Sequence, residues 1–155
     1  MKLTTMTRYG TRAVFDIAYH SVGLPVPVQE ISARQEIPIR YLEQIFHKLI
    51  KAKLLKSKKG PSGGYVLAMA PGKITVGDII RAVKEPLDLV FCVSAEAENG
   101  KACHKVDQCV TMPVWEAAGK LLKDYFDSIT ITDLCENARS LDVKKESSYP
   151  FDYSI

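Results

Sequence analysis

The chain has 155 residues, of which 46% are hydrophobic and 25% are charged, and its net charge is +3 at pH 7. This length and composition are typical of one soluble globular domain and exclude a disordered or fibrous protein. Charged side chains interrupt the apolar residues at the N-terminus, and no run approaches the roughly 18 to 20 apolar residues of a membrane helix. We therefore expect a cytoplasmic protein whose thiols are reduced.

The charges are distributed unevenly along the chain. Residues 1–80 carry 12 Lys and Arg against 5 Asp and Glu, whereas residues 81–155 carry 9 against 13. The basic half indicates a surface that meets an anionic partner, and nucleic acid is the commonest partner of this kind.

Three helices are predicted in the first fifty residues. Apolar residues at helical spacing predict a first helix from Thr7 to about Ser21, which the prolines of the segment GLPVP end. A short second helix is expected from Val28 to about Gln35. A third begins after Pro38, and its apolar residues are Ile39, Leu42, Ile45, Phe46 and Leu49.

A hairpin and a fourth helix follow. Two short strands, Leu54–Lys58 and Tyr65–Ala68, flank the segment KGPSGG, whose Gly and Pro residues allow a tight hairpin tip. Thr75 is the predicted N-cap of a helix that ends before Pro86. Helices followed by a Gly-rich hairpin in a basic half-chain predict a mainly α fold with a small β-hairpin, the winged helix-turn-helix.

Polar side chains lie opposite the predicted buried face of the third helix. They are Arg40, Tyr41, Gln44, His47, Lys48 and Lys51. Arg and Gln can make bidentate contacts with base edges, whereas Lys48 and Lys51 suit phosphates. An ordinary solvated helix face is the alternative, but the basic hairpin tip with Lys58 and Lys59 favours DNA binding.

Three of the four cysteines, Cys92, Cys103 and Cys109, lie on one polar segment. Their spacing matches neither the C-x2-C pairs of zinc sites nor the cysteine runs of ferredoxins. Three soft ligands still favour iron-sulfur or zinc chemistry, with unligated surface thiols as the alternative. The fourth ligand stays open among His104, the acidic residues Glu96, Glu98 and Asp107, solvent and a partner's residue. Cys135 is predicted to be a buried core thiol.

A long helix is predicted after the cysteines. Thr111 is its expected cap, Pro113 fits its first turn, and its apolar stripe consists of Trp115, Ala118, Leu122, Tyr125, Phe126 and Ile129. The stripe packs either on its own domain or on a symmetry mate. A short terminal helix and a loose tail follow. The sequence has no nucleophile elbow and no phosphate loop before a helix, so we expect no enzyme.

Several of these stretches together resemble one known group. The opening MKLTTMTRYGTRAVFDIA, the segments YLEQ, KGPSGGY and ITVGDIIRAV, and the three cysteines before Trp115 are similar to the Rrf-two family of winged-helix regulators over about residues 1–140. The resemblance implies a homodimer joined through the long helix and a cluster on the three cysteines. It implies that Tyr41 and Gln44 read bases and that Lys59, at the wing tip with Ser62, enters the minor groove. Cluster-assembly regulators of the family have a histidine ligand where this chain has Met112.

We therefore predict a homodimeric, DNA-binding repressor whose affinity for a double-stranded operator is controlled by an iron-sulfur cluster, two-iron rather than four-iron. The predicted divisions are a winged-helix domain over 1–84, a cysteine loop over 85–110, the dimerisation and terminal helices over 111–140, and a flexible tail over 141–155. The predicted cluster ligands are Cys92, Cys103 and Cys109, and the predicted DNA contacts are Arg40, Tyr41, Gln44, Lys48, Lys59 and Ser62. A cluster-free thiol-redox switch and a zinc-stabilised DNA-binding module are the rival interpretations.

Overall fold

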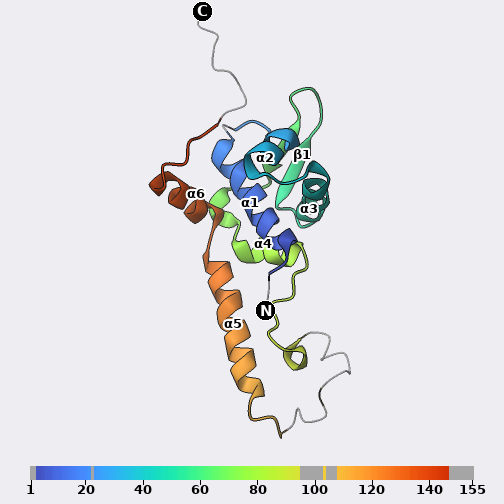
Figure 1. The fold of residues 1–155 in the computed structure, drawn as a ribbon, viewed down its shortest axis with the longest axis vertical. Coiled ribbons are helices and arrows are strands. Elements are labelled where there is room, and N and C mark those ends of the chain that lie inside the picture. Colours follow the sequence, from blue (N-terminus) through green and yellow to red (C-terminus); the bar gives the residue numbers. More distant parts are fainter. Residues whose placement is uncertain (1–2, 22, 95–102, 104–107, 147–155) are drawn as a thin grey trace, which may run out of the picture.

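The structure is a computed structural model that describes residues 3–21, 23–94, 103 and 108–146. Figure 1 shows a helical body with a two-stranded hairpin and one long projecting helix. The elements in chain order are α1 (Thr5–His20), α2 (Val28–Gln35), α3 (Ile39–Lys51), β1 (Leu55–Lys58), β2 (Gly64–Leu67), the 3-10 turn η1 (Pro71–Lys73), α4 (Val76–Ala82), the 3-10 turn η2 (Phe91–Val93), α5 (Met112–Ser128) and α6 (Ile131–Ser140). The predicted mainly α fold with a small hairpin is confirmed.

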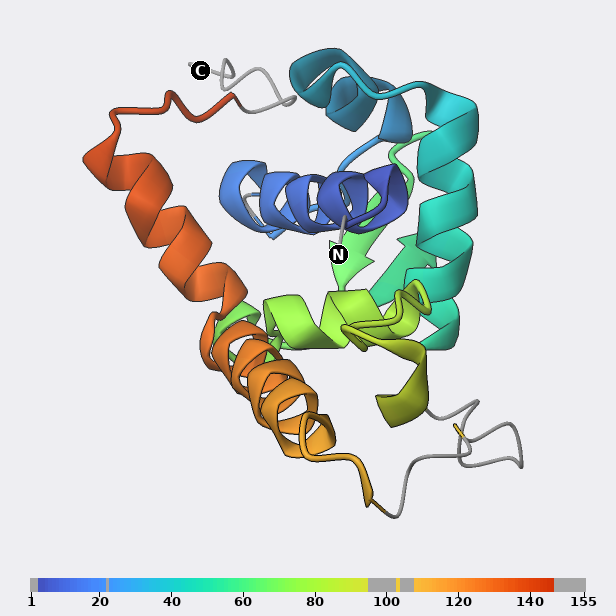
Figure 2. The same ribbon diagram turned by 60° about the horizontal axis from the view of Figure 1, so that its bottom comes forward.

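Helix α1 forms the centre of the body. It packs against α2, α3, α4, α6 and β2, and Figure 2 shows it between α3 and the α6 side of the molecule. The core side chains that lose all contact with water include Ile17, Ile31, Leu42, Ile45 and Leu49. The predicted apolar face of α3 is therefore the buried one, because its spacing matches the helical repeat.

Ile39 is the exception to the predicted apolar face of α3. It is 37% exposed, although its neighbours along the stripe are buried. Ile39 is the first residue of α3, and Pro38 before it is also exposed. The helix therefore begins at the rim of the core, which hydrophobic spacing alone does not indicate.

The two strands pair antiparallel, with Leu55 opposite Leu67 and Lys58 opposite Gly64. Strand β1 begins one residue later than predicted and ends as predicted, and β2 lies one residue earlier than predicted. A bridge between Val26 and Tyr65 ties the first residues of β2 to the chain before α2 through two backbone hydrogen bonds of 2.9 Å. Gly64 has a φ of +156°, and a Cβ there would lie 2.4 Å from the carbonyl oxygen of Val26. Only glycine fits this close approach of two backbones.

Side-chain caps set several helix ends. α1 begins two residues before the predicted start because the Thr4 side chain accepts a hydrogen bond from the Thr7 amide. Thr75 caps α4 as predicted, and Asp78 completes a capping box. Thr111 precedes α5, but its side chain makes no capping hydrogen bond, so that part of the prediction is wrong. Its hydroxyl lies 3.4 Å from Cys109 Sγ instead.

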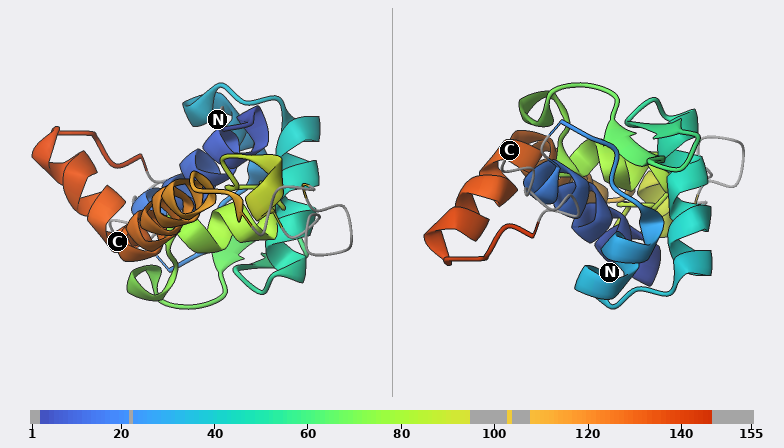
Figure 3. Two further views of the ribbon diagram at one scale, coloured as in Figure 1. Left: turned by 90° about the horizontal axis from the view of Figure 1, so that it is seen from below. Right: turned by 90° about the horizontal axis from the view of Figure 1, so that it is seen from above.

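Helices α5 and α6 extend the body away from α3. Figure 1 shows α5 projecting below the body, and both views of Figure 3 place α6 at the side opposite α3. A second capping box, made by Thr130 and Asp133, starts α6. Thr130 also forms a bridge with Thr75, so the starts of α4 and α6 lie together.

The first residues of the expected flexible tail contact α1. The Tyr19 hydroxyl donates to the carbonyl oxygen of Val143 at 2.7 Å, and the Glu146 amide donates to Nδ1 of His20 at 3.0 Å. Residues 147–155 lie outside the described part of the chain. In the described part, no helix has the length and apolar character needed to cross a membrane.

Candidate DNA-binding surface and cysteine segment

The polar face of α3 is exposed. Leu42, Ile45, Phe46 and Leu49 point into the core, so Arg40, Glu43, Gln44 and His47 lie on the opposite side of the helix in contact with solvent. The structure therefore brings the predicted base-reading residues Arg40 and Gln44 to one surface. An exposed helix of 13 residues that carries Arg and Gln is the arrangement that reads base edges in the major groove.

Tyr41 is held in place by another aromatic ring. Its ring packs edge-on against that of Tyr9 in α1, with the centroids 5.6 Å apart. The guanidinium of Arg12 lies 5.7 Å from the centroid of Tyr9. Tyr41 is half-buried as a result, and its orientation depends on α1. Sequence analysis missed Tyr9, because nothing in the spacing of two distant tyrosines indicates that they meet.

The wing tip carries the other predicted DNA contacts. Lys59 and Ser62 are exposed at the end of the hairpin, next to Gly60, which has a φ of +113°. The Tyr65 ring lies 4.3 Å from that of Phe46, centroid to centroid, and so fixes the wing against α3. Burial, together with the nearby Glu43 carboxylate, raises the pKa of Tyr65. This aromatic contact holds the wing and α3 together.

Lys48 lies differently from the other predicted contacts. It is half-buried, and its Nζ donates to the carbonyl oxygen of Val83 at 3.2 Å and lies 3.1 Å from Met6 Sδ. The ammonium group is thus turned toward the ends of α1 and α4. The predicted contact between Lys48 and a phosphate has no support from this orientation.

The predicted cluster ligands are reduced and accessible. Cys92 lies in η2 and is half-buried, Cys103 is exposed, and Cys109 is half-buried just before α5. Cys135 is buried in α6, as predicted. The described residues contain no group of three or more His, Cys, Asp or Glu side chains placed to hold a metal ion. His104, the suggested fourth ligand, lies outside the described residues.

Cys109 and Cys135 differ in chemistry. Hydrogen bonds from the Thr111 hydroxyl and from the amides of Thr111 and Met112 lower the pKa of Cys109, which favours its thiolate. Burial raises the pKa of Cys135. A thiolate is the form that binds soft metal ions, which favours Cys109 over the buried Cys135 as a ligand.

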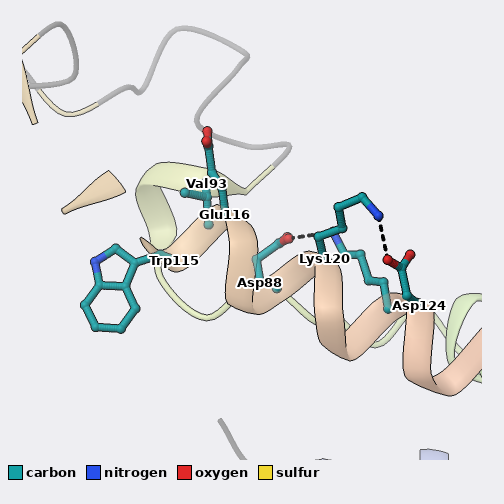
Figure 4. Close-up of a pocket in the computed structure, with 8 residues that line it drawn as sticks. Asp88, Val93, Trp115, Glu116, Lys120 and Asp124 are labelled. Atoms are coloured by element: carbon teal, nitrogen blue, oxygen red, sulfur yellow. Dashed lines mark hydrogen bonds and ion pairs between the residues drawn. The ribbon is translucent and has the colours of Figure 1, made fainter. Parts of the chain in front are cut away.

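A pocket of about 320 Å³ lies between η2 and the first half of α5. Figure 4 shows Val93 of η2 beside Glu116 of α5, with Lys120 and Asp124 further along α5 and Asp88, from the chain before η2, next to the helix. Lys123 donates to Asp88 at 3.1 Å and ties the chain before η2 to α5. The segment that carries Cys92 is therefore in direct contact with the long helix.

The long helix has two apolar faces. Leu122, Phe126 and Ile129 are half-buried on the body, whereas Val114, Leu121 and Tyr125 are 58%, 70% and 61% exposed. The predicted single stripe is therefore divided, and Tyr125 belongs to the outer face. Exposed apolar residues at helical spacing on a projecting helix are typical of a protein–protein contact.

Comparisons with known proteins agree with this arrangement. Residues 3–137 match the model of the Rrf2 family, described as an iron-dependent transcriptional regulator. The HTH-type transcriptional regulator IscR of Pectobacterium carotovorum subsp. carotovorum (strain PC1) is 39% identical over 143 residues, which cover 92% of this chain and 84% of that protein. IscR of Xenorhabdus nematophila is 38% identical over the same shares of both chains.

Two solved structures share the fold. T. potens IscR has a TM-score of 0.73 at 36% identity and covers 94% of both chains. CymR, the global cysteine regulator of B. subtilis, has a TM-score of 0.69 at 29% identity and covers 88% of this chain and 98% of its own. These relatives are regulators rather than enzymes, as the sequence predicts. The chain belongs to the Rrf2 family of DNA-binding transcription regulators.

Proposed function

We propose that the protein is a cytoplasmic homodimeric repressor whose affinity for an operator is set by an iron-sulfur cluster on Cys92, Cys103 and Cys109. The observation that carries the cluster is the donor set: three free thiols on one segment, one of which has a lowered pKa. Soft thiolates of this kind suit iron-sulfur clusters. When bound, the cluster would supply bonds between iron and the cysteines, and these bonds would respond to redox state, nitric oxide or iron supply.

The DNA contacts proposed for each protomer come from α3 and the wing. Arg40, Tyr41 and Gln44 reach base edges from α3, while Lys59 and Ser62 contact the minor groove and backbone from the wing. The exposure of Arg40, Gln44, Lys59 and Ser62 supports this assignment. The contact of Lys48 with a DNA phosphate stays a prediction, and the internal hydrogen bond of Lys48 gives that contact no support.

The dimer is proposed to form through the outer face of α5, where Val114, Leu121 and Tyr125 are exposed. Two copies related by a two-fold axis present two α3 helices to an operator with two half-sites. Residues 85–110 connect the winged-helix domain of residues 1–84 to this dimerisation helix. A change at the cysteines therefore alters the chain between the DNA-binding domain and the dimer contact.

The proposed cluster is of the two-iron kind, as the family resemblance implies. The fourth ligand is a group other than Met112, because a thioether is a poor iron-sulfur ligand. A site with one non-cysteine position suits a sensor, since that position is the one most open to exchange.

The cluster is tested by purifying the full chain without oxygen and measuring visible absorbance, iron and sulfide on one sample. We expect broad visible absorbance with about two irons and two sulfides per chain. Cys92→Ala, Cys103→Ala and Cys109→Ala should each remove the absorbance, whereas the matched control Cys135→Ala should keep it. Operator affinity measured with and without the cluster then shows whether the cluster controls binding.

The rival interpretations give different results in the same experiment. A colourless protein that contains zinc indicates the zinc-stabilised module. A metal-free protein whose operator affinity changes with thiol oxidation indicates the thiol-redox switch. Either result overturns the proposed cluster and leaves the DNA-binding family assignment intact.

A further inference from the structure

Three parts of the chain meet at the C-terminal end of α4. Val83 is the C-cap of α4, and its carbonyl oxygen accepts a hydrogen bond of 3.2 Å from Lys48 Nζ on α3. Met6 Sδ, in the first turn of α1, lies 3.1 Å from the same Nζ. An ammonium group stabilises the last carbonyls of a helix, because these carbonyls carry partial negative charge and have no partner within the helix.

The chain just beyond α4 is tied to the start of α1. The Glu85 carboxylate accepts hydrogen bonds from the Thr4 amide at 3.1 Å and from the Thr7 hydroxyl at 2.7 Å, and it also contacts the Thr4 hydroxyl. A carboxylate at a helix N-terminus is favourable because of the positive end of the helix dipole. Burial would raise the pKa of Glu85, but the hydrogen bonds from Thr4 and Thr7 leave it lowered, so the ionised form makes this contact.

The same region is tied to α5. Arg81 forms an ion pair of 2.7 Å with Asp127, and Lys123 forms one of 3.1 Å with Asp88. The start of α4 is joined to the α5–α6 connection by a hydrogen bond of 2.9 Å from the Val76 amide to the carbonyl oxygen of Ile129. Helix α4 therefore contacts the long helix on one side and the recognition helix α3 on the other, as Figure 2 shows.

The distance along the chain between these contacts and the cysteines is short. Cys92 follows Glu85 by seven residues, and Asp88, which lies between them in the sequence, forms the ion pair with Lys123 of α5. A displacement of Cys92 or α5 therefore acts on the end of α4 directly. The end of α4 in turn contacts α3 through Lys48, whose Nζ donates to the carbonyl oxygen of Val83.

We propose that Lys48 and Glu85 are positioning residues that couple Cys92 and α5 to the recognition helix through the end of α4. This inference rests on the proposed function. Lys48 then orients α3 and does not contact a DNA phosphate. Glu85 holds the chain after α4 at the start of α1. A change in the position of Cys92 is therefore transmitted to α3 and is not absorbed by movement of the chain between α4 and η2.

The test measures the operator dissociation constant of the full chain with the cluster bound and after its removal, each over a series of salt concentrations. The coupling ratio is the larger of these two dissociation constants divided by the smaller. Lys48→Met should move this ratio toward one by about two- to thirtyfold, the range expected when a coupling contact is lost. It should leave the dependence of affinity on salt unchanged, because no phosphate contact is removed.

Matched controls separate positioning from phosphate binding. Lys51→Met, an exposed lysine on the same helix, and Lys59→Met on the wing should keep the coupling ratio. Lys59→Met should lower the salt slope by about one, as loss of a phosphate contact does. Lys48→Arg should keep the wild-type coupling ratio. Glu85→Gln should move the ratio toward one without a change in the dependence of affinity on salt. Thermal unfolding of each variant shows that the fold is retained.

The outcomes distinguish this inference from the function on which it rests. A wild-type ratio of one overturns cluster control, and the coupling role of Lys48 and Glu85 with it. A wild-type ratio well above one that Lys48→Met leaves unchanged, with a salt slope lowered by about one, overturns only this inference. That result assigns Lys48 to a phosphate.

Discussion

At the scale of single residues, the α3 surface combines side chains with different tasks. Arg40 and Gln44 are free of core contacts, whereas Tyr41 is positioned by the Tyr9 ring and Lys48 by the Val83 carbonyl. Side chains that read bases gain specificity from bidentate hydrogen bonds, and lysines on the wing gain affinity from charge.

Gln44→Ala is expected to weaken binding to the preferred operator by about tenfold to a hundredfold and to relax the preference at one base pair, because a bidentate contact with a base edge is lost. Lys59→Ala should instead weaken binding to all sequences by a similar factor. The measurement is a binding titration against operators with each base pair changed in turn. Uniform weakening by Gln44→Ala would show that this residue does not read a base.

His20 makes the stability depend on pH. It is 8% exposed, and burial lowers its pKa, with Arg34 lowering it further and Asp16 and Glu146 opposing. The unfolded chain therefore binds a proton more tightly than the folded one. The resulting stability is fully present above the unfolded pKa of about 6.5 and is lost as the pH falls below it.

We expect the free energy of unfolding of the wild type, measured with urea, to decrease as the pH is lowered from 7.5 to 5.5. His20→Gln should show a shallower fall, because the group that binds the extra proton is gone. His47→Gln is the matched control, since His47 is exposed on α3 and should leave the slope unchanged. Equal slopes for the wild type and His20→Gln would contradict the buried, neutral state of His20.

At the scale of elements, α4 is held at both ends by polar contacts and along its length by close packing. A Cβ at Gly77 would lie 1.8 Å from Asp127 Oδ1 and 3.2 Å from the Asp127 backbone nitrogen. The absence of a side chain at Gly77 therefore lets α5 approach α4 and lets Asp127 reach Arg81 at 2.7 Å.

Gly77→Ala should lower the free energy of unfolding by about 1 to 2 kcal/mol, because Asp127 must turn away and leave Arg81. In an Asp127→Ala background the same change should cost less, since the clashing carboxylate is absent and alanine is the better helix former. Chemical denaturation of the four proteins of this cycle measures both effects. Additive changes would mean that Gly77 and Asp127 do not interact.

At the scale of the whole molecule, the outer face of α5 is an exposed apolar face in the described structure. Val114, Leu121 and Tyr125 follow one another at helical spacing on a helix that projects from the body. A second copy covers this face in the proposed dimer, and burial of each such side chain is worth about 1.5 to 3 kcal/mol.

Leu121→Glu should weaken the dimer at least tenfold, because a carboxylate would be buried without a partner at the contact. Operator affinity should fall with it, since a monomer binds one half-site. Leu24→Glu, which changes another exposed apolar residue in the connection between α1 and α2, is the control and should stay dimeric. The mass in solution, measured by light scattering over a range of concentrations, shows whether each variant is a monomer or a dimer.

The sequence alone determined the three N-terminal helices, the hairpin, the cap at Thr75 and the place of Pro113 in the first turn of α5, because these depend on local spacing and local hydrogen bonds. It also indicated the exposed face of α3, since apolar periodicity defines the opposite face. The hairpin strands start one residue away from their predicted positions, and Ile39 is exposed although its spacing predicted a buried side chain. Both differences lie at the ends of elements, where local signals are weakest.

Only the tertiary structure decided which distant groups meet. The edge-on contact of Tyr9 with Tyr41, the hydrogen bond from Lys48 to Val83 and the contacts of Glu85 with Thr4 and Thr7 join residues more than thirty positions apart. The division of the α5 stripe into an inner and an outer face likewise depends on where the body ends. Periodicity shows that a helix has an apolar side, but only the packing of the other elements shows how much of that side they cover.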